Sequence, residues 1–202
     1  MVIIINKNVI ILTLSLKYND YCIAAYDASN NEIIRLVKDT SRENGIPKAY
    51  ASNINLLDEV SIKILGDSPK EHQTENVLID LEYGLKPTGE KGDIRTIYNC
   101  LPECISVFGD CEYKLNNISN LDHSLEIIKF KNMVIRKNDY NKPKVDFECG
   151  IERHLSYSIT DPGFYDKETK IDSGYAVVSL PASDDFTEQK GYYKYVSAIY
   201  PD

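Results

Sequence analysis

Short β-rich segments separated by turn clusters are the feature that most limits what this chain can fold into. Three of them follow one another near the N-terminus, at residues 9–16 (VIILTLSL), 21–26 (YCIAAY) and 32–37 (EIIRLV). Residues 57–65 (LDEVSIKIL) form a fourth segment, with apolar residues at alternate positions. The pattern predicts a β-meander followed by one more strand, in a small barrel.

The second half of the chain repeats this order of elements without repeating its sequence. Its five strand-like segments are 125–136, 144–149, 153–159, 175–180 and 192–200. A long loop precedes the fourth strand of each half, at 38–55 and at 161–174. We therefore expect an all-β fold of two small β-barrels in tandem, with little helix.

The boundary between the barrels is expected in a segment rich in turn residues. Residues 83–92 contain three glycines and a proline. The predicted domains are a first barrel at 1–83, a connection at 84–103 and a second barrel at 104–202. The best helix candidate is 93–99, with 116–123 as a weaker one.

The charge balance and the apolar runs bound the location and the partners of the protein. The chain has 23 Lys and Arg against 31 Asp and Glu, a formal net charge of -8, so its surface as a whole repels a polyanion. Any contact with nucleic acid must therefore be local. The longest apolar run, 8–16, is too short to span a bilayer, and the N-terminus lacks the features of a signal peptide. We expect a cytoplasmic protein with no membrane partner.

Three of the five cysteines cluster in the sequence. Cys100, Cys104 and Cys111 have the spacing C-x3-C-x6-C, whereas structural zinc sites usually offer tight C-x2-C pairs. A zinc site completed by Cys149, His123 or His154 is one interpretation. Small thiols in the core are the other, and we expect no metal and no cofactor.

Catalytic motifs are missing from the sequence. The chain has no phosphate-binding loop, no dinucleotide fingerprint, no H-E-x-x-H and no G-x-S-x-G. His72, Glu75 and Asp80 offer an imidazole near carboxylates, but their spacing matches no known catalytic signature. We therefore expect a binding module and no catalytic residues, with an enzyme as the less favoured reading.

Several segments together resemble the bacterial dual OB-containing domain family over nearly the whole chain. They are ILTLSLKYNDYCIAAYDASNNEIIRLV, LLDEVSIKILGDSPKEHQTENVLID, LSYSITDPGFYDKE, YAVVSLPASDDF and YYKYVSAIY. The most specific block is His72 to Asn76 (HQTEN) followed by Leu78 to Asp80, although the family commonly has Trp where this chain has Val77. The resemblance implies two OB-like barrels and binding of nucleic acid or nucleotides, often in mobile-element or antiviral defence settings.

The first barrel offers one candidate ligand site. OB folds bind ligands across the middle strands of the sheet, with nearby loops closing over them. Arg35 would bind an anion, Tyr21 would stack on a flat ring, and the polar block after the fourth strand would read the ring's edge. The predicted ligand-binding residues are Lys17, Tyr21, Arg35, His72, Gln73, Glu75 and Asn76. The alternative is structural, with Arg35 paired to a nearby acid and the block satisfying loop backbone groups.

The second barrel contains the basic island of an acidic chain. Residues 129–144 hold six Lys or Arg and one acid, Asp139, with Phe130 and Tyr140 among them. The candidate phosphate-binding residues are Lys129, Lys131, Arg136 and Lys137. Lysines that block edge-to-edge pairing of an exposed strand are the alternative.

Two functions follow from these patterns. The first is a non-enzymatic module that binds single-stranded nucleic acid or a nucleotide-type ligand. The alternative is a protein-interaction scaffold that docks a protein partner on acidic, tyrosine-rich barrel surfaces.

Overall fold

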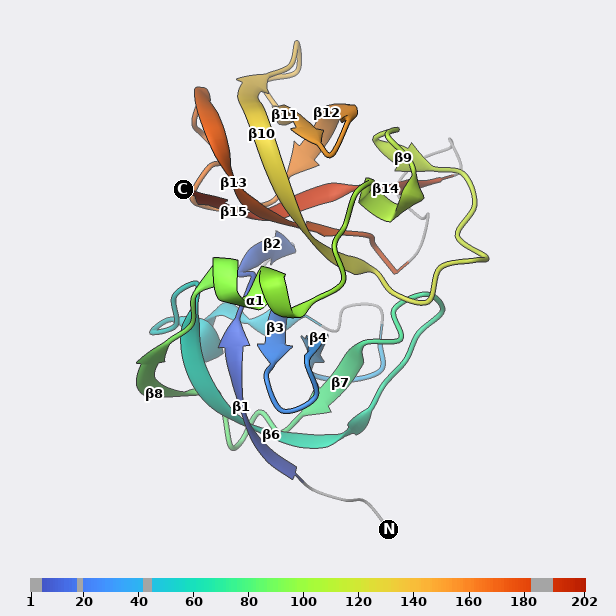
Figure 1. Ribbon diagram of the computed structural model, residues 1–202. Coiled ribbons are helices and arrows are strands. Elements are labelled where there is room, and N and C mark those ends of the chain that lie inside the picture. Colours follow the sequence, from blue (N-terminus) through green and yellow to red (C-terminus); the bar gives the residue numbers. More distant parts are fainter. Residues whose placement is uncertain (1–4, 18–19, 42–44, 183–190) are drawn as a thin grey trace. The chain divides into compact units, whose positions relative to one another are not determined.

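The chain folds into two compact units built almost entirely from strands. A computed structural model describes residues 5–17, 20–41, 45–182 and 191–202, without the side chain of residue 17 (Figure 1). The units are Met1–Leu101 and Pro102–Asp202, each with its own buried core. The helices are η1 (Lys48–Ala51), α1 (Ile94–Cys100) and η2 (Val107–Gly109). None of the helices in the described part of the chain is long and apolar enough to cross a membrane.

Five strands of the first unit pair in a closed circuit. They are β1 (Ile5–Ile11), β3 (Asp20–Asp27), β4 (Glu32–Val37), β7 (Asn76–Ile79) and β6 (Asp58–Asp67), and β6 pairs back with β1. All of these pairings are antiparallel except that of β4 with β7, which is parallel. Three short strands lie beside the circuit: β2 (Ser15–Lys17) and β5 (Ile46–Pro47) on β3, and β8 (Lys86–Lys91) on β6.

The second unit repeats this circuit. Its closed barrel runs through β10 (Leu125–Lys137), β11 (Pro143–Cys149), β12 (Glu152–Ile159), β15 (Tyr195–Pro201) and β13 (Thr169–Ser179). The third and last strands, β12 and β15, again pair in parallel. A separate pair is formed by β9 (Lys114–Leu115) and β14 (Tyr192–Tyr193). Both units are five-stranded barrels of OB type, so the predicted all-β fold of two OB-like barrels is confirmed.

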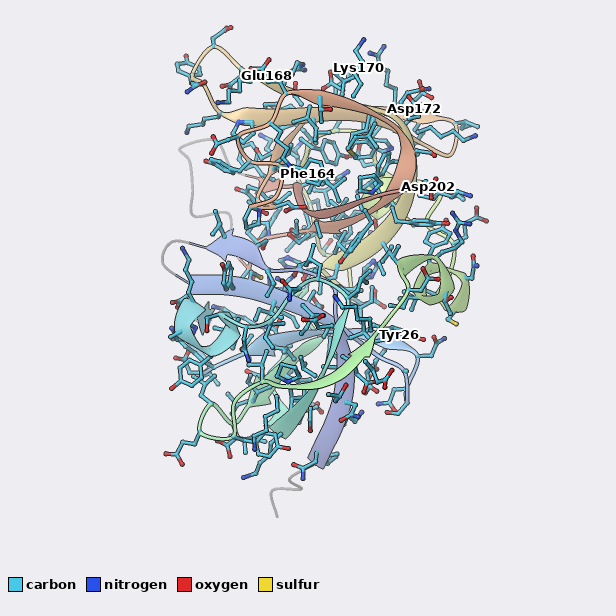
Figure 2. All side chains as sticks on the ribbon, turned by 90° about the vertical axis from the view of Figure 1, so that its left-hand side faces the viewer. Tyr26, Phe164, Glu168, Lys170, Asp172 and Asp202 are labelled. Carbon is cyan, nitrogen blue, oxygen red and sulfur yellow. The ribbon has the colours of Figure 1, made fainter. Side chains whose placement is uncertain are left out.

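Alternation of side chains explains why these segments close into barrels. In β11, Val145, Phe147 and Cys149 point into the core, and the residues between them are half exposed. The long strand β10 carries an irregularity between Lys131 and Val134, where an extra residue bends the strand. Figure 2 shows the outward side chains of Lys170 and Asp172 on β13, which agrees with their exposure.

The structure also differs from the sequence-based expectations at several elements. Strand β7 was not predicted, because it has only four residues and the first of them, Asn76, ends the polar block. The segment 84–103 contains α1, where a helix was expected at 93–99, but also the unexpected β8, which gives no apolar signal because all six of its residues are exposed. Strand β13 begins inside the expected loop 161–174. The weak helix prediction at 116–123 is wrong, since these residues form turns that the Asn-rich sequence favours.

Candidate nucleic-acid interface

Arg35 lies on the face of β4 that points away from the first core. Its neighbours Ile34 and Leu36 belong to that core, and successive side chains of a strand point to opposite faces. The guanidinium donates from Nη1 to the sulfur of Cys22 at 2.7 Å and from Nη2 to Oε1 of Glu75 at 3.4 Å. Arg35 is 4% exposed. The side chain is therefore held in a buried ion pair.

The partners of Arg35 set its charge state. Burial lowers the pKa of the guanidinium, but the Cys22 sulfur and the Glu75 carboxylate outweigh burial and raise that pKa. Arg35 is charged, and Glu75 balances the charge within the protein. A phosphate at this position would have to compete with the Glu75 carboxylate.

The polar segment before β7 lies directly beside Arg35, because β7 pairs in parallel with β4. Arg35 is opposite Asn76, and its backbone N–H donates to the carbonyl of Glu75 at 2.9 Å. The Asn76 side chain donates to Oε1 of Gln73 at 3.4 Å. The buried residues of the segment are His72, Gln73 and Asn76. The structure thus places Glu75 and Asn76 beside Arg35, with Gln73 bonded to Asn76.

Tyr21 and Lys17 are placed differently from Arg35. Tyr21 packs against the first core, so its ring and the Arg35 guanidinium lie on opposite faces of the sheet. The ammonium of Lys48 lies 5.7 Å from the centre of the Tyr21 ring. Lys17 ends β2, opposite Asp20, and its side chain is outside the described part of the molecule. The structure does not bring Tyr21 and Arg35 together as one ligand site.

A row of polar side chains crosses the outer face of the second barrel. Arg136 on β10 is opposite Lys144 on β11, which is opposite Ser158 on β12; residues paired in this way share one face of the sheet. Lys144 donates to the Ser158 hydroxyl at 2.8 Å. Nη2 of Arg136 lies 2.9 and 3.0 Å from the two carboxylate oxygens of Asp146 and 3.3 Å from the Ser156 hydroxyl.

The loop between β10 and β11 presents an aromatic ring next to this row. The side chain of Asn138 accepts from the backbone N–H of Tyr140 at 3.1 Å and of Lys142 at 2.9 Å, and the Asn138 N–H donates to the Lys142 carbonyl at 2.9 Å. These bonds fix a tight turn. Tyr140 stands at its tip with 83% of its surface exposed.

Like charges crowd together at this end of the barrel. Burial lowers the pKa of Lys144, and the positive charges of Lys142 and Arg136 lower it further. Arg136 lies opposite Lys144, and Lys142 precedes Lys144 by two residues, so both positive charges act on the Lys144 ammonium. An anion bound among them would relieve the repulsion. The basic face is the name used below for the outer face of β10, β11 and β12 at this end, formed by Arg136, residues 138–142, Lys144, Asp146, Ser156 and Ser158.

A match to a family model identifies the family of the chain, in agreement with its two barrels. The family model described as Dual OB-containing domain matches residues 7–199. The chain belongs to the dual OB-containing domain family. A search of curated proteins gives no match, and a search of solved structures gives none either. Membership in the dual OB-containing domain family indicates a binding module in general.

Both candidate sites of this dual OB-containing chain lie at equivalent places in their barrels. OB folds take ligands on the second and third strands and on the adjoining loops. In the first barrel these strands are β3 and β4, where the Arg35 and Glu75 side chains pair with each other. In the second barrel they are β11 and β12, where the basic face is open to solvent at Tyr140.

The four predicted cations of β10 are spread along the strand. Lys129 is exposed opposite Tyr175, and Lys131 is exposed opposite Glu148. The ammonium of Lys137 lies 3.8 Å from a carboxylate oxygen of Asp166. Arg136 alone of the four belongs to the basic face. A binding role for Lys129, Lys131 and Lys137 stays a prediction.

Sequence reasoning missed three polar residues of this surface. Ser156 and Ser158 contact Arg136 and Lys144, and Tyr195 is opposite Ser158 on the neighbouring strand. The alternation of β12 predicts a solvated face, which was the available signal for the two serines. Tyr195 comes to this row only through the parallel pairing of β12 with β15, which no local pattern shows.

The zinc interpretation of the cysteines finds no cluster to support it. Cys100 and Cys111 are exposed. Among the residues that the structure describes, no group of three or more His, Cys, Asp and Glu side chains is placed to hold a metal ion.

Proposed function

We propose that this protein binds single-stranded nucleic acid on the basic face of its second barrel. The crowding of Arg136, Lys142 and Lys144 carries the proposal. Arg136 and Lys144 lie opposite each other on β10 and β11, with Lys142 next to them, in the part of the barrel where OB folds bind their ligands. Phosphates would bridge Lys142 and Lys144, and the guanidinium of Arg136 would stay oriented by Asp146 while it contacts a phosphate with its remaining N–H groups.

Tyr140 supplies the second part of a single-strand site. Aromatic rings next to a basic groove stack with bases at a gain of roughly 1 to 3 kcal/mol per base. The ring of Tyr140 is exposed on a turn whose backbone is held by hydrogen bonds. Little order is lost when a base stacks on such a ring. The net charge of -8 confines the attraction to this face.

Fluorescence anisotropy with a labelled single strand of about 16 nucleotides tests the proposal. Affinity should fall roughly tenfold between about 50 and 200 mM salt if two or three phosphates are contacted. The double variant Lys142→Gln with Lys144→Gln should weaken binding about tenfold and flatten the salt dependence. A mononucleotide added as competitor separates recognition of a strand from recognition of a single nucleotide.

Lys129→Gln is the matched control. It removes one positive charge from the neighbouring strand β10, at a position that pairs with Tyr175 and lies outside the basic face. Binding should be nearly unchanged in this variant. Equal weakening by Lys129→Gln and by Lys144→Gln alone would show that only the overall charge matters, and the proposed interface would then be wrong.

Protein binding is the second candidate function, and two exposed isoleucines favour it. Ile105 and Ile151 are exposed, and the carbonyl of Ile105 lies against the turn at Gly150 that precedes Ile151. Adjacent exposed apolar side chains are typical of protein interfaces. If this is the function, a partner protein captured from a host lysate should stay bound at high salt and should be lost in Ile151→Ser. The protein should then not bind the oligonucleotide.

A further inference from the structure

Two thiols meet in the second barrel, away from the basic face. Cys149 ends β11, at the opposite end from Lys144, and Cys104 lies in the segment that leads to η2. The thiol of Cys149 donates to the carbonyl oxygen of Cys104 at 3.5 Å, so the Cys149 sulfur lies against the backbone of Cys104. Both are free cysteines.

The backbones at these two positions are also in close approach. A Cβ atom added to Gly150 would lie 2.7 Å from the carbonyl oxygen of Ile105. The chain at 104–105 is therefore packed directly on the chain at 149–150. A disulfide needs Cβ atoms about 4 Å apart, which requires two backbones in close approach, as those of residues 104–105 and 149–150 are.

A carboxylate is in place to take the proton of one thiol. Cys104 donates its S–H to Oε2 of Glu126 at 3.3 Å, and the same oxygen accepts from the backbone N–H of Phe108 at 2.7 Å, which fixes the carboxylate. Cys104 is half-buried and Cys149 is buried. An external reagent therefore meets Cys104 first.

We propose that Cys104 and Cys149 form a disulfide by exchange with a low-molecular-weight disulfide. Cys104 gives its proton to Glu126 and attacks one sulfur of the reagent, whose other half leaves as a thiolate that takes a proton and becomes a thiol. The thiol of Cys149 then attacks the Cys104 sulfur of the mixed disulfide, and the second half of the reagent leaves as a thiol. The protein loses two electrons and two protons, and one reagent disulfide becomes two thiols.

The pKa values of the two thiols determine the rates of the two exchange steps. The neighbouring Cys149 thiol, then burial and the Glu126 carboxylate, raise the pKa of Cys104. The first step is therefore slow at neutral pH. The neighbouring Cys104 thiol lowers the pKa of Cys149, which favours its attack in the second step. We therefore expect the Cys104–Cys149 disulfide to form slowly, as suits a bond with a structural role.

The bond would lock a segment of the core to the barrel. Val107 and Phe108, which follow Cys104, are buried in the second core. A covalent link between Cys104 and β11 would hold this segment in place during partial unfolding. The inference does not rest on the proposed nucleic-acid function.

Peptide mapping of the full chain, equilibrated with oxidised and reduced glutathione, tests the proposal. After the remaining thiols are alkylated, cleavage beside Glu103, Asp110, Glu148 and Glu152 with Glu-C and Asp-N proteases isolates each cysteine of the pair. The expected product joins peptide 104–109 to peptide 149–152, with Cys22, Cys100 and Cys111 alkylated. The oxidised protein should also melt at a higher temperature than the reduced protein.

Two variants distinguish this bond from general oxidation. Cys111→Ser removes an exposed thiol and should leave the cross-link and the rise in melting temperature unchanged. Cys149→Ser should abolish both, with Cys104 held as a glutathione adduct. Pairing of Cys104 with Cys100 or Cys111 in the full chain, or glutathione adducts at Cys104 and Cys149 without a cross-link, would overturn the proposal.

Discussion

The imidazole of His123 lies between two carboxylates. Its Nδ1 is 2.8 Å from Oδ1 of Asp122, and its Nε2 is 3.2 Å from Oε1 of Glu126. Both ring nitrogens are donors when the ring is protonated. The bond to Glu126 and the bond to Asp122 raise the pKa of His123 from 6.5 to about 9, against the opposing effect of burial.

A raised pKa makes the stability of the second unit depend on pH. The charged ring is favoured in the folded state, so its contribution is complete below pH 6.5 and is lost as the pH rises through about 9. In His123→Gln this contribution is absent at every pH. Urea unfolding near pH 6 and near pH 10 should therefore show a larger difference between the two proteins at the lower pH. A difference that is the same at both pH values would contradict the prediction.

Lys194 binds two backbone carbonyls inside the second barrel. Its ammonium donates to the carbonyls of Val107 and Asp110, and its side chain is fully buried. Burial lowers the pKa of Lys194. Lys194→Met keeps the apolar stem but leaves both carbonyls unsatisfied, which should cost about 2 to 4 kcal/mol of unfolding free energy.

Urea unfolding followed by circular dichroism measures this loss. Lys129→Met is the control, because the same change at an exposed position should stay within about 0.5 kcal/mol. A loss below about 1 kcal/mol in Lys194→Met would mean that water replaces the ammonium at the two carbonyls.

Residue positions in the first site were only partly predictable. An OB barrel places the loop after its fourth strand beside its third strand, so the neighbourhood of Arg35 and the segment 72–76 could be expected. The ion pair of Arg35 with Glu75 joins residues 40 positions apart. The structural alternative predicted from the sequence paired Arg35 with an acid closer to it in the sequence. Burial of a charged side chain depends on such distant partners, and local patterns do not contain them.

At the scale of elements, strands with an alternating apolar face were predicted well. The predicted strand 32–37 coincides with β4, whose core side chains alternate with the outward Arg35. Strand β8 has six exposed residues and pairs with β6 through its backbone and through exposed polar side chains such as Thr88 and Lys91. Strand β7 joins β4 and β6, which are distant in the sequence. Hydrogen bonding between distant segments leaves no periodic signal, so such strands escape a sequence-based prediction.

Gly174 is the point where β13 passes closest to the C-terminal strand. A Cβ atom there would lie 2.3 Å from the carbonyl oxygen of Tyr200 and 2.9 Å from the ring of Phe130. Gly174→Ala should therefore push β13 away from β15 and lower the unfolding free energy by about 2 to 3 kcal/mol.

Gly66→Ala separates steric contact from backbone strain. Gly66 has a φ of 157° with nothing within 4 Å of an added Cβ, so only strain of about 1 kcal/mol is expected. Urea unfolding monitored by circular dichroism compares the two variants. An equal loss of unfolding free energy in both variants would show that the close contact of β13 with β15 at Gly174 adds nothing to the cost of backbone strain.

At the scale of the molecule, the same strand circuit occurs twice in one chain. The long loops before the fourth strand of each half predicted this duplication. The closing parallel pairs, β4 with β7 and β12 with β15, are equivalent in the two units. Each circuit encloses its own core, one within residues 9–85 and one within residues 104–199. A unit with a closed circuit and a complete core is expected to fold by itself.

Residues 102–202 expressed alone should therefore fold and keep the proposed activity. The second core, the basic face and the turn with Tyr140 all lie in this unit. Circular dichroism should show a strand-rich spectrum and a cooperative transition. Anisotropy should give the same affinity and the same salt dependence for the labelled strand as the full chain, because the phosphate contacts are unchanged. Residues 1–101 alone should not bind, since Glu75 neutralises Arg35. Binding by residues 1–101 and not by 102–202 would move the site to the first barrel.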